Sequence, residues 1–228
     1  MFISGILLAA GSSTRMGADK LLLPYQGRRL IDRALAALVD CPLINEVLIV
    51  VRPDFPPPWE GDPREGEAPA EPSSAWEGEA PAEPPSAREA EAPAEPLLAA
   101  HPKCRLVVNP DHRQGMGTSL RTGVQAANPA ADAYVLSLAD MPEITSDIVA
   151  ALIDAFYKAG KQVLIPVFDQ RHGHPVIFAA SCRAELLRLS ADAGPRAFIA
   201  AHPELVAYHP VPHSGVLRDI DTPADLQP

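Results

Sequence analysis

The chain has few of the features that stabilise secreted or membrane proteins. Its three cysteines, Cys41, Cys104 and Cys182, are widely spaced and form no C-x-x-C pair. Such a set excludes a disulfide framework and is typical of a reducing cytosol. No apolar run approaches the ~20 residues that a membrane-spanning helix needs. Met1 to Ala10 is apolar but lacks a basic region and runs into a Gly/Ser loop, which indicates a first strand and not a signal peptide. These absences predict a cytoplasmic location.

Outside one segment, the chain also has no excess of positive or negative charge. The formal net charge of −10 arises between Pro53 and Ala100, where twelve acidic residues accompany only Arg64 and Arg88. The remaining 180 residues carry 17 basic and 17 acidic side chains, so no global field favours nucleic acid or a membrane surface. The hydrophobic content of 47% is ample for a folded core.

The acidic segment is a low-complexity insert. EGEAPAEPSSAW, EGEAPAEPPSAR and EAEAPAEP repeat with a period of 12 residues, starting at Glu65, Glu77 and Glu89. Units of Ala, Pro and Glu bury too little apolar surface to offset chain entropy, and the prolines prevent a continuous helix. We therefore expect residues 53–100 to form a disordered or partly polyproline loop, and not a binding motif. This loop would interrupt a single domain that spans residues 1–228.

Short apolar runs alternate with helical patterns on both sides of the insert. The runs predict strands at residues 2–10, 47–51, 105–108, 133–138 and 163–166, and helices at 29–39, 119–127 and 148–159. Thr145 and Ser146 precede the last helix as candidate caps. Continuous apolar strands between helices predict one Rossmann-like α/β domain, whose mostly parallel sheet is covered by helices on both faces. In such sheets ligands bind at the carboxyl ends of the strands, so function should lie in the loops that follow them.

The loop after the first strand is suited to phosphates. It reads ILLAAGSSTRMGADKLLLPY from Ile6 to Tyr25. Gly11 and Gly17 allow backbone N–H groups to approach anionic oxygens. Arg15 can grip a phosphate, and Lys20 can place a charge where negative charge develops. The spacing fits neither G-x-x-x-x-G-K-[ST] nor G-x-G-x-x-G. A Gly/Ser turn with an unrelated Arg and Lys is the alternative.

A second glycine-containing segment, VVNPDHRQGMGTSLRTGVQAA, follows the insert. Gly115 and Gly117 allow the backbone to approach a flat base, and a narrow backbone-lined pocket would favour a pyrimidine. Ser119 stands at the expected helix start, where its hydroxyl can contact a base edge or cap the helix.

Three aspartates follow apolar segments. Asp140 comes after the strand of YVLSLADMPEITSD, at the expected carboxyl edge of the sheet. A carboxylate there is a natural Mg²⁺ ligand, because Mg²⁺ takes one or two carboxylates and completes its shell with phosphate and water. The alternative is an Asp that caps the following turn. In LRDIDTPADL, Asp219 and Asp221 would share one face of an extended segment, before Thr222 and Pro223 start a terminal helix.

Polar residues also occur between these aspartates. His172 and His174 flank a glycine before a strand. They can contact an acceptor, make structural hydrogen bonds or bind a metal, although no third metal ligand is nearby in sequence. Arg196 can meet an acceptor phosphate or remain solvated.

Four of these segments together resemble one family. L-A-A-G-x-S-x-R-M-G-x-x-K in the first loop resembles the signature of the MobA-like NTP transferases. N-x-x-x-x-x-G-M-x-x-S-L-x-x-G and G-H-P resemble its molybdenum cofactor cytidylyltransferase branch, and D-I-D-T-P-x-D-L resembles the family's late motif. The resemblance covers residues 1–52 and 101–228. Residues 191–194, ADAG, depart from the pattern because they lack the Gly that we expect before the Asp.

The resemblance implies an Mg²⁺-dependent nucleotidyltransferase that moves CMP from CTP to molybdopterin and releases pyrophosphate. Lys20 would stabilise charge on the α-phosphate, and Arg15 would grip the β- and γ-phosphates. The metal ligands would be Asp140 and Asp219, with Asp221 structural or in the outer shell. The residues implied at the nucleotide are Leu8, Ala9, Ala10, Gly11, Ser12, Arg15, Lys20, Gly115 and Ser119. The residues implied on the acceptor side are His172, His174 and Arg196.

The specific substrate is also a matter of resemblance. Ala9 and Ala10 look like the cytidylyl branch, whereas the guanylyl branch usually has two glycines before its Ser. A molybdoenzyme or a maturation chaperone would be the protein partner. Two alternatives stay open, namely another phosphorylated acceptor or GTP as donor, and a non-catalytic nucleotide-binding accessory protein of molybdoenzyme maturation. The non-catalytic alternative is disfavoured because the residues implied in catalysis and metal binding are all present, namely Arg15, Lys20, Asp140 and Asp219.

Overall fold

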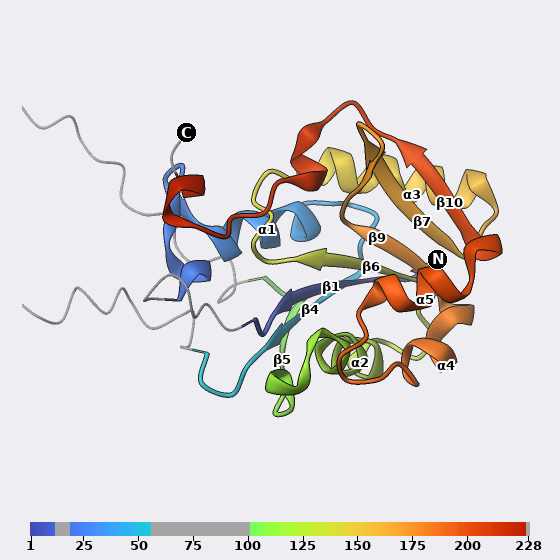
Figure 1. The fold of residues 1–228 in the computed structure, drawn as a ribbon, viewed down its shortest axis with the longest axis horizontal. Coiled ribbons are helices and arrows are strands. Elements are labelled where there is room, and N and C mark those ends of the chain that lie inside the picture. Colours follow the sequence, from blue (N-terminus) through green and yellow to red (C-terminus); the bar gives the residue numbers. More distant parts are fainter. Residues whose placement is uncertain (12–18, 56–100, 227–228) are drawn as a thin grey trace, which may run out of the picture.

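The main sheet has eight strands, and the computed structural model describes residues 1–11, 19–55 and 101–226 (Figure 1). The strand order is β10-β7-β9-β6-β1-β4-β5, with β8 paired to β7. The strands are β1 (Ile3–Ala9), β4 (Glu46–Val51), β5 (Cys104–Val108), β6 (Ala133–Leu138), β7 (Val163–Phe168), β8 (Arg171–His172), β9 (Val176–Ala179) and β10 (Val206–Pro210). The helices are α1 (Leu30–Val39), α2 (Met116–Ala126), α3 (Ser146–Ala159), α4 (Arg183–Leu186) and α5 (Pro195–Ala201).

Strand β1 has a core on each of its faces. All seven of its residues are buried, and successive side chains point to opposite faces of a strand. Ile3 and Leu7 join the core cluster that includes residues of α1 and α3. Ile6 and Leu8 join the cluster that includes residues of α2, α4 and α5. Figure 1 shows these two groups of helices on opposite sides of the sheet, as the continuous apolar strands predict.

Most of the sheet is parallel, which confirms the predicted Rossmann-like α/β fold. Strands β5, β4, β1 and β6 run parallel, and β10 runs parallel to β7. Strand β9 is antiparallel to both β6 and β7. The carboxyl ends of β1 and β6 therefore meet at one edge, where the loops of interest begin.

Helix ends agree with the sequence at α3 and differ at α2. The side chain of Thr145 accepts a hydrogen bond from the Ile148 amide, so Thr145 is the predicted cap of α3. Helix α2 begins at Met116, three residues before the start expected at Ser119. Glycine is a poor helix former. Because Gly117 lies in the first turn, helix propensity predicts a start after this residue.

A small hairpin carries the chain from the first loop into α1. Its strands are β2 (Pro24–Tyr25) and β3 (Arg28–Arg29), after the 3-10 helix η1 (Lys20–Leu22). Tyr25 and Leu30 form a separate apolar cluster with Ile220, against which Leu226 packs. In Figure 1 the C-terminal segment accordingly lies beside this hairpin. It ends in the short 3-10 helix η7 (Pro223–Leu226), the predicted terminal helix.

The folded part extends further toward the insert than predicted. Phe55 is 9% exposed and belongs to the core cluster of α1, and the guanidinium of Arg52 lies 5.4 Å from the centre of its ring. The boundary expected at Pro53 is therefore too early, because the aromatic ring finds a buried place. Residues 56–100 lie outside the described part of the chain. Within the described ranges, no helix is both long and apolar enough to cross a membrane.

Candidate active site

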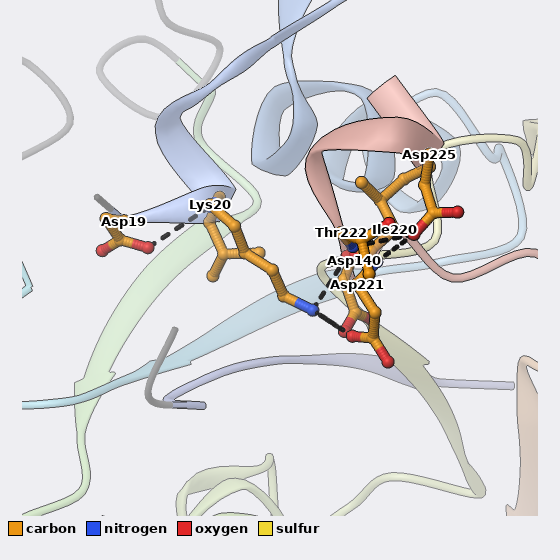
Figure 2. A network of polar contacts seen from close by, with 8 residues as sticks. Asp19, Lys20, Asp140, Ile220, Asp221, Thr222 and Asp225 are labelled. Atoms are coloured by element: carbon orange, nitrogen blue, oxygen red, sulfur yellow. Dashed lines mark hydrogen bonds and ion pairs between the residues drawn. The ribbon is translucent and has the colours of Figure 1, made fainter. Parts of the chain in front are cut away.

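Lys20 is the centre of a polar network at the carboxyl edge of the sheet (Figure 2). Its Nζ lies 2.9 Å from Asp140 Oδ2 and 2.7 Å from Asp221 Oδ1. The same ammonium donates to the backbone carbonyl of Ile220 at 2.9 Å. Three segments that are distant in sequence, namely the first loop, the end of β6 and the C-terminal segment, thus meet at one cation.

The network keeps Lys20 charged. Burial disfavours an ammonium and acts to lower the pKa of Lys20. The hydrogen bonds to Asp140 and Asp221, together with their negative charges, outweigh burial, so the pKa lies above its ordinary value of 10.5. The side chain is only 15% exposed, so a fixed positive charge is held beside the expected phosphate loop throughout the neutral range.

Asp140 has one carboxylate oxygen without a partner. Oδ2 accepts from Lys20, whereas Oδ1 is buried and has no hydrogen-bond partner among the described residues. A buried charged oxygen is costly unless a donor or a metal meets it. The described residues contain no group of three or more His, Cys, Asp or Glu side chains that could hold a metal alone. Mg²⁺ does not require one, because nucleotide and water oxygens complete its shell. Asp140 therefore fits such an ion.

The C-terminal aspartates are held next to Asp140 by the backbone. The Ile220 amide donates to the Asp140 carbonyl at 2.9 Å, and the Ile220 side chain is fully buried. Asp225 Oδ2 accepts from the amide of Asp221 at 3.1 Å and from the amide and hydroxyl of Thr222 at 2.7 and 2.8 Å. The carboxylate that joins Asp140 at Lys20 belongs to Asp221, and the structural or outer-shell role expected for Asp221 stays a prediction.

Arg52 and Asp19 form a brace that the sequence reasoning missed. Asp19 precedes Lys20, and one of its carboxylate oxygens accepts from the Leu21 amide at 3.3 Å. The other meets the guanidinium of Arg52, at the end of β4, which also pairs with Asp54 at 3.1 Å. This brace fixes the backbone from which Lys20 extends. A basic residue directly after a buried strand was the available signal.

His174 and His172 have different surroundings. Burial lowers the pKa of His174, so its imidazole is neutral. The Leu136 carbonyl acts to raise that pKa and is therefore a hydrogen-bond acceptor. Its Nδ1 atom is buried and has no hydrogen-bond partner among the described residues. The charges of Asp140, Asp219 and Arg196 all act on this ring.

His172 instead lies on β8 and is exposed. Its ring stacks on that of Tyr208 from β10, with centroids 4.8 Å apart. The charged groups of Asp140, Asp219 and Arg196 thus lie near enough to act on His174, whereas His172 has a separate ring partner.

Gly115 and Gly117 pack against a neighbouring backbone segment. A Cβ on Gly117 would lie 2.2 Å from the carbonyl oxygen of Ser190, and one on Gly115 would lie 2.6 Å from that of Ala191. Gly115 also has a φ of 130°, which L side chains rarely adopt. The Gly117 amide donates to the Ala191 carbonyl at 3.0 Å. Both glycines are thus required by contact with residues 190–193, which overlap residues 191–194, the segment that departs from the family pattern.

Ser119 does not cap α2. The N-cap is Gly115, and it makes no side-chain cap hydrogen bond. The buried hydroxyl of Ser119 accepts from Asn109 Nδ2 at 2.9 Å, and the same nitrogen donates to Thr118 Oγ1 at 2.9 Å. The capping interpretation is therefore wrong, because the earlier helix start places Ser119 inside α2. Contact with a nucleotide base stays a prediction for both Gly115 and Ser119.

The remaining described residues that we expect at the nucleotide lie at and directly after the end of β1. Leu8, Ala9 and Ala10 are buried, and Gly11 is exposed. Ser12, Arg15 and Gly17 fall outside the described residues, so their expected contacts with phosphate stay predictions.

The cation held between carboxylates lies at the carboxyl edge of a mostly parallel sheet, where open α/β sheets bind their ligands. The chain matches the MobA-like NTP transferase domain over residues 5–206 and belongs to that family, which confirms the resemblance. It is a nucleotidyltransferase by this membership.

Three relatives show how far the similarity extends. The purine catabolism protein PucB of Bacillus subtilis (strain 168) is 28% identical, over 98% of this chain and 94% of its own. The nicotine blue oxidoreductase of Paenarthrobacter nicotinovorans is 29% identical, over 96% and 92%. Rv0371c of Mycobacterium tuberculosis H37Rv has a similar fold, with a TM-score of 0.68 and 21% identity over 99% and 96%. It has also been solved in complex with manganese, with a TM-score of 0.66.

Proposed function

We propose that the protein transfers CMP from CTP to molybdopterin in the cytoplasm and releases pyrophosphate. The observation that carries this proposal is the Lys20 ammonium, held by Asp140 and Asp221 directly after the phosphate loop. In the reaction, a terminal phosphate oxygen of molybdopterin attacks the α-phosphorus of CTP, and the bond to the β-phosphate oxygen breaks. A molybdoenzyme or a maturation chaperone would receive the product.

The residues supply position and charge more than covalent chemistry. Arg15 would hold the β- and γ-phosphates, and Lys20 would neutralise the negative charge that grows on the α-phosphate. His174 and Arg196 would face the acceptor. His172, with its stacked ring partner, would lie at the margin of that side.

A divalent cation would bind between Asp140 and Asp219. The unpartnered Oδ1 of Asp140 supports this proposal, because it leaves one carboxylate lone pair for a metal. Mg²⁺ bound there would screen the charges of the phosphates during transfer. Manganese in the structure of Rv0371c is consistent with a divalent ion in this fold.

The choice of cytosine as the nucleotide base rests on the residues at the end of β1. Ala9 and Ala10 resemble the cytidylyl branch, and the packing of Gly117 on Ser190 and Ala193 limits the room near α2. We expect CTP to exceed GTP by at least about tenfold in kcat/KM, since a close-fitting pocket excludes a purine by more than ~1.4 kcal/mol.

The test incubates the protein with molybdopterin, Mg²⁺ and each of CTP, GTP, ATP and UTP, and detects pyrophosphate. Parallel reactions replace molybdopterin with a sugar phosphate. Equal rates with CTP and GTP would leave only the family assignment. Turnover with the sugar phosphate but not with molybdopterin would show that the acceptor is another phosphorylated compound. Binding of nucleotide without pyrophosphate in any reaction would support the non-catalytic accessory role.

A further inference from the structure

All three N–H donors of the Lys20 ammonium are in use. An ammonium has three donors and no acceptor, and Lys20 donates to Asp140, to Asp221 and to the carbonyl of Ile220. In this arrangement no donor remains for a phosphate. Lys20 must therefore leave one of its acceptors before it can act on a nucleotide.

The two carboxylates differ in their surroundings. Asp140 is 24% exposed and lies at the end of β6, and its second oxygen is buried with no partner among the described residues. Asp221 is 51% exposed and lies on the C-terminal segment that also provides the Ile220 carbonyl. Asp225 fixes the turn at Asp221 through hydrogen bonds to its amide and to Thr222.

A divalent cation and the ammonium would compete for Asp140. A cation at Asp140 repels the neighbouring ammonium, because like charges disfavour each other at close range. The acceptors that stay available to Lys20 are then Asp221 and the Ile220 carbonyl, which lie on one braced segment.

We propose that Asp221 is the positioning residue of Lys20, which retains the ammonium when a divalent cation takes Asp140 and so frees one N–H donor for the phosphate. This inference rests on the metal site of the proposed function. It assigns Asp221 to Lys20 and not to the metal.

The test is a double-mutant cycle in metal affinity, with Mn²⁺ alone and no nucleotide. Free Mn²⁺ is measured by electron paramagnetic resonance for the full chain and for Lys20→Met, Asp221→Asn and the double variant. Lys20→Met should bind Mn²⁺ at least ~5-fold more tightly, because the competing ammonium is gone. Asp221→Asn should weaken Mn²⁺ binding while Lys20 is present and change it less than ~2-fold in the Lys20→Met background.

The opposite results are equally clear. An equal loss on Asp221→Asn in both backgrounds makes Asp221 a metal ligand and overturns the proposal. Unchanged affinity in Lys20→Met, or no Mn²⁺ binding in any variant, also overturns it. Lys161→Met is the matched control, because its exposed ammonium donates only to the Glu204 carbonyl among the described residues. It should leave Mn²⁺ affinity unchanged.

Two further measurements separate this proposal from the proposed function. Asp140→Asn should reduce Mn²⁺ binding in every background, and if it does not, the metal site itself is wrong. The identity of the nucleotide does not enter the cycle, so failure of the CTP assay leaves its result intact. In turnover assays with a nucleotide that the enzyme uses, Asp221→Asn should lower kcat more than it raises KM. A purely structural loss would lower the melting temperature instead.

Discussion

The amide of Ile220 donates a hydrogen bond to the backbone carbonyl of Asp140 at 2.9 Å. This bond ties the C-terminal segment to the end of β6, and it sets Asp219 and Asp221 on either side of the residue that touches Asp140. The charges of Asp140 and Asp219 both reach His174. A shared metal site for these two aspartates stays a prediction, and the backbone bond is its main support.

Asp140→Asn and Asp219→Asn should each abolish most turnover and weaken binding of Mg²⁺ with CTP. Each aspartate alone gives the ion too few protein ligands. Stability should fall by no more than about 1 kcal/mol, because no core packing is removed. Pyrophosphate release and thermal melts measure the two effects. Asp169→Asn is the control, since Asp169 is exposed and its φ of 46° suits Asn. Full activity of Asp219→Asn would transfer the metal role to Asp221 or remove it from the mechanism.

Lys20→Ala should lower kcat by about 10²–10³ and shift the nucleotide Kd far less, by analogy with the loss of one preorganised donor to a developing negative charge. Steady-state kinetics and nucleotide titration separate these quantities. Lys161→Ala should behave like the unaltered protein. A change confined to KM would instead make Lys20 a uniform clamp for phosphate.

Replacing residues 56–100 by a short Gly/Ser linker should leave folding and turnover nearly unchanged. Loop closure depends only weakly on length, and this version keeps Phe55 in the core. A deletion that begins at Pro53 should cost about 3 kcal/mol more, because it empties the site of a buried aromatic ring. Urea unfolding of both proteins measures the difference. Loss of a cooperative transition in the shorter deletion would make the insert structural.

Cys182 should resist alkylation at pH 8. Burial raises its pKa to about 11 from 9.0, and the thiolate is the reactive form. Between those two values the unfolded thiol loses its proton while the folded one keeps it. The free energy of unfolding should therefore decrease as pH rises from 9.0 to about 11. Iodoacetamide labelling and urea melts at several pH values test this, and Cys182→Ala should reduce the slope. Rapid labelling of the native protein at pH 8 would contradict the assignment.

The parallel core was predictable because its strands are apolar on both faces and separated by amphipathic helices. The antiparallel insertion of β9 was not. It follows a tight reversal in which Asp169 and Gln170 adopt φ values of 46° and 60°, and Gln170 does not signal such a turn as a glycine would. Phe55 was likewise missed, because Pro53 and the acidic repeats dominate the composition around it.

Sequence reasoning predicted a site at the edge that β1 and β6 share, and Lys20 and Asp140 do meet there. The partnership of Lys20 with Asp221 and the Ile220 carbonyl depends on a turn that Asp225 holds, and residue type alone does not define that turn. A glycine in the sequence also indicates that another group can approach the backbone closely, but not which group does so. The sequence suggested that Gly115 and Gly117 admit a base, which stays a prediction, but it did not indicate that residues 190–193 pack against both glycines.

The distance in sequence between Lys20 and its C-terminal acceptors has a consequence for biosynthesis. Ile220 follows Lys20 by 200 residues, so a chain growing from its N-terminus makes the lysine early and the acceptors late. Until then the ammonium can meet only Asp140 among its three acceptors, and the apolar cluster of Tyr25 and Leu30 lacks Ile220. N-terminal parts of a domain can gain structure during synthesis. The nascent protein could therefore form most of its sheet on the ribosome before the residues that hold the Lys20 ammonium have been made.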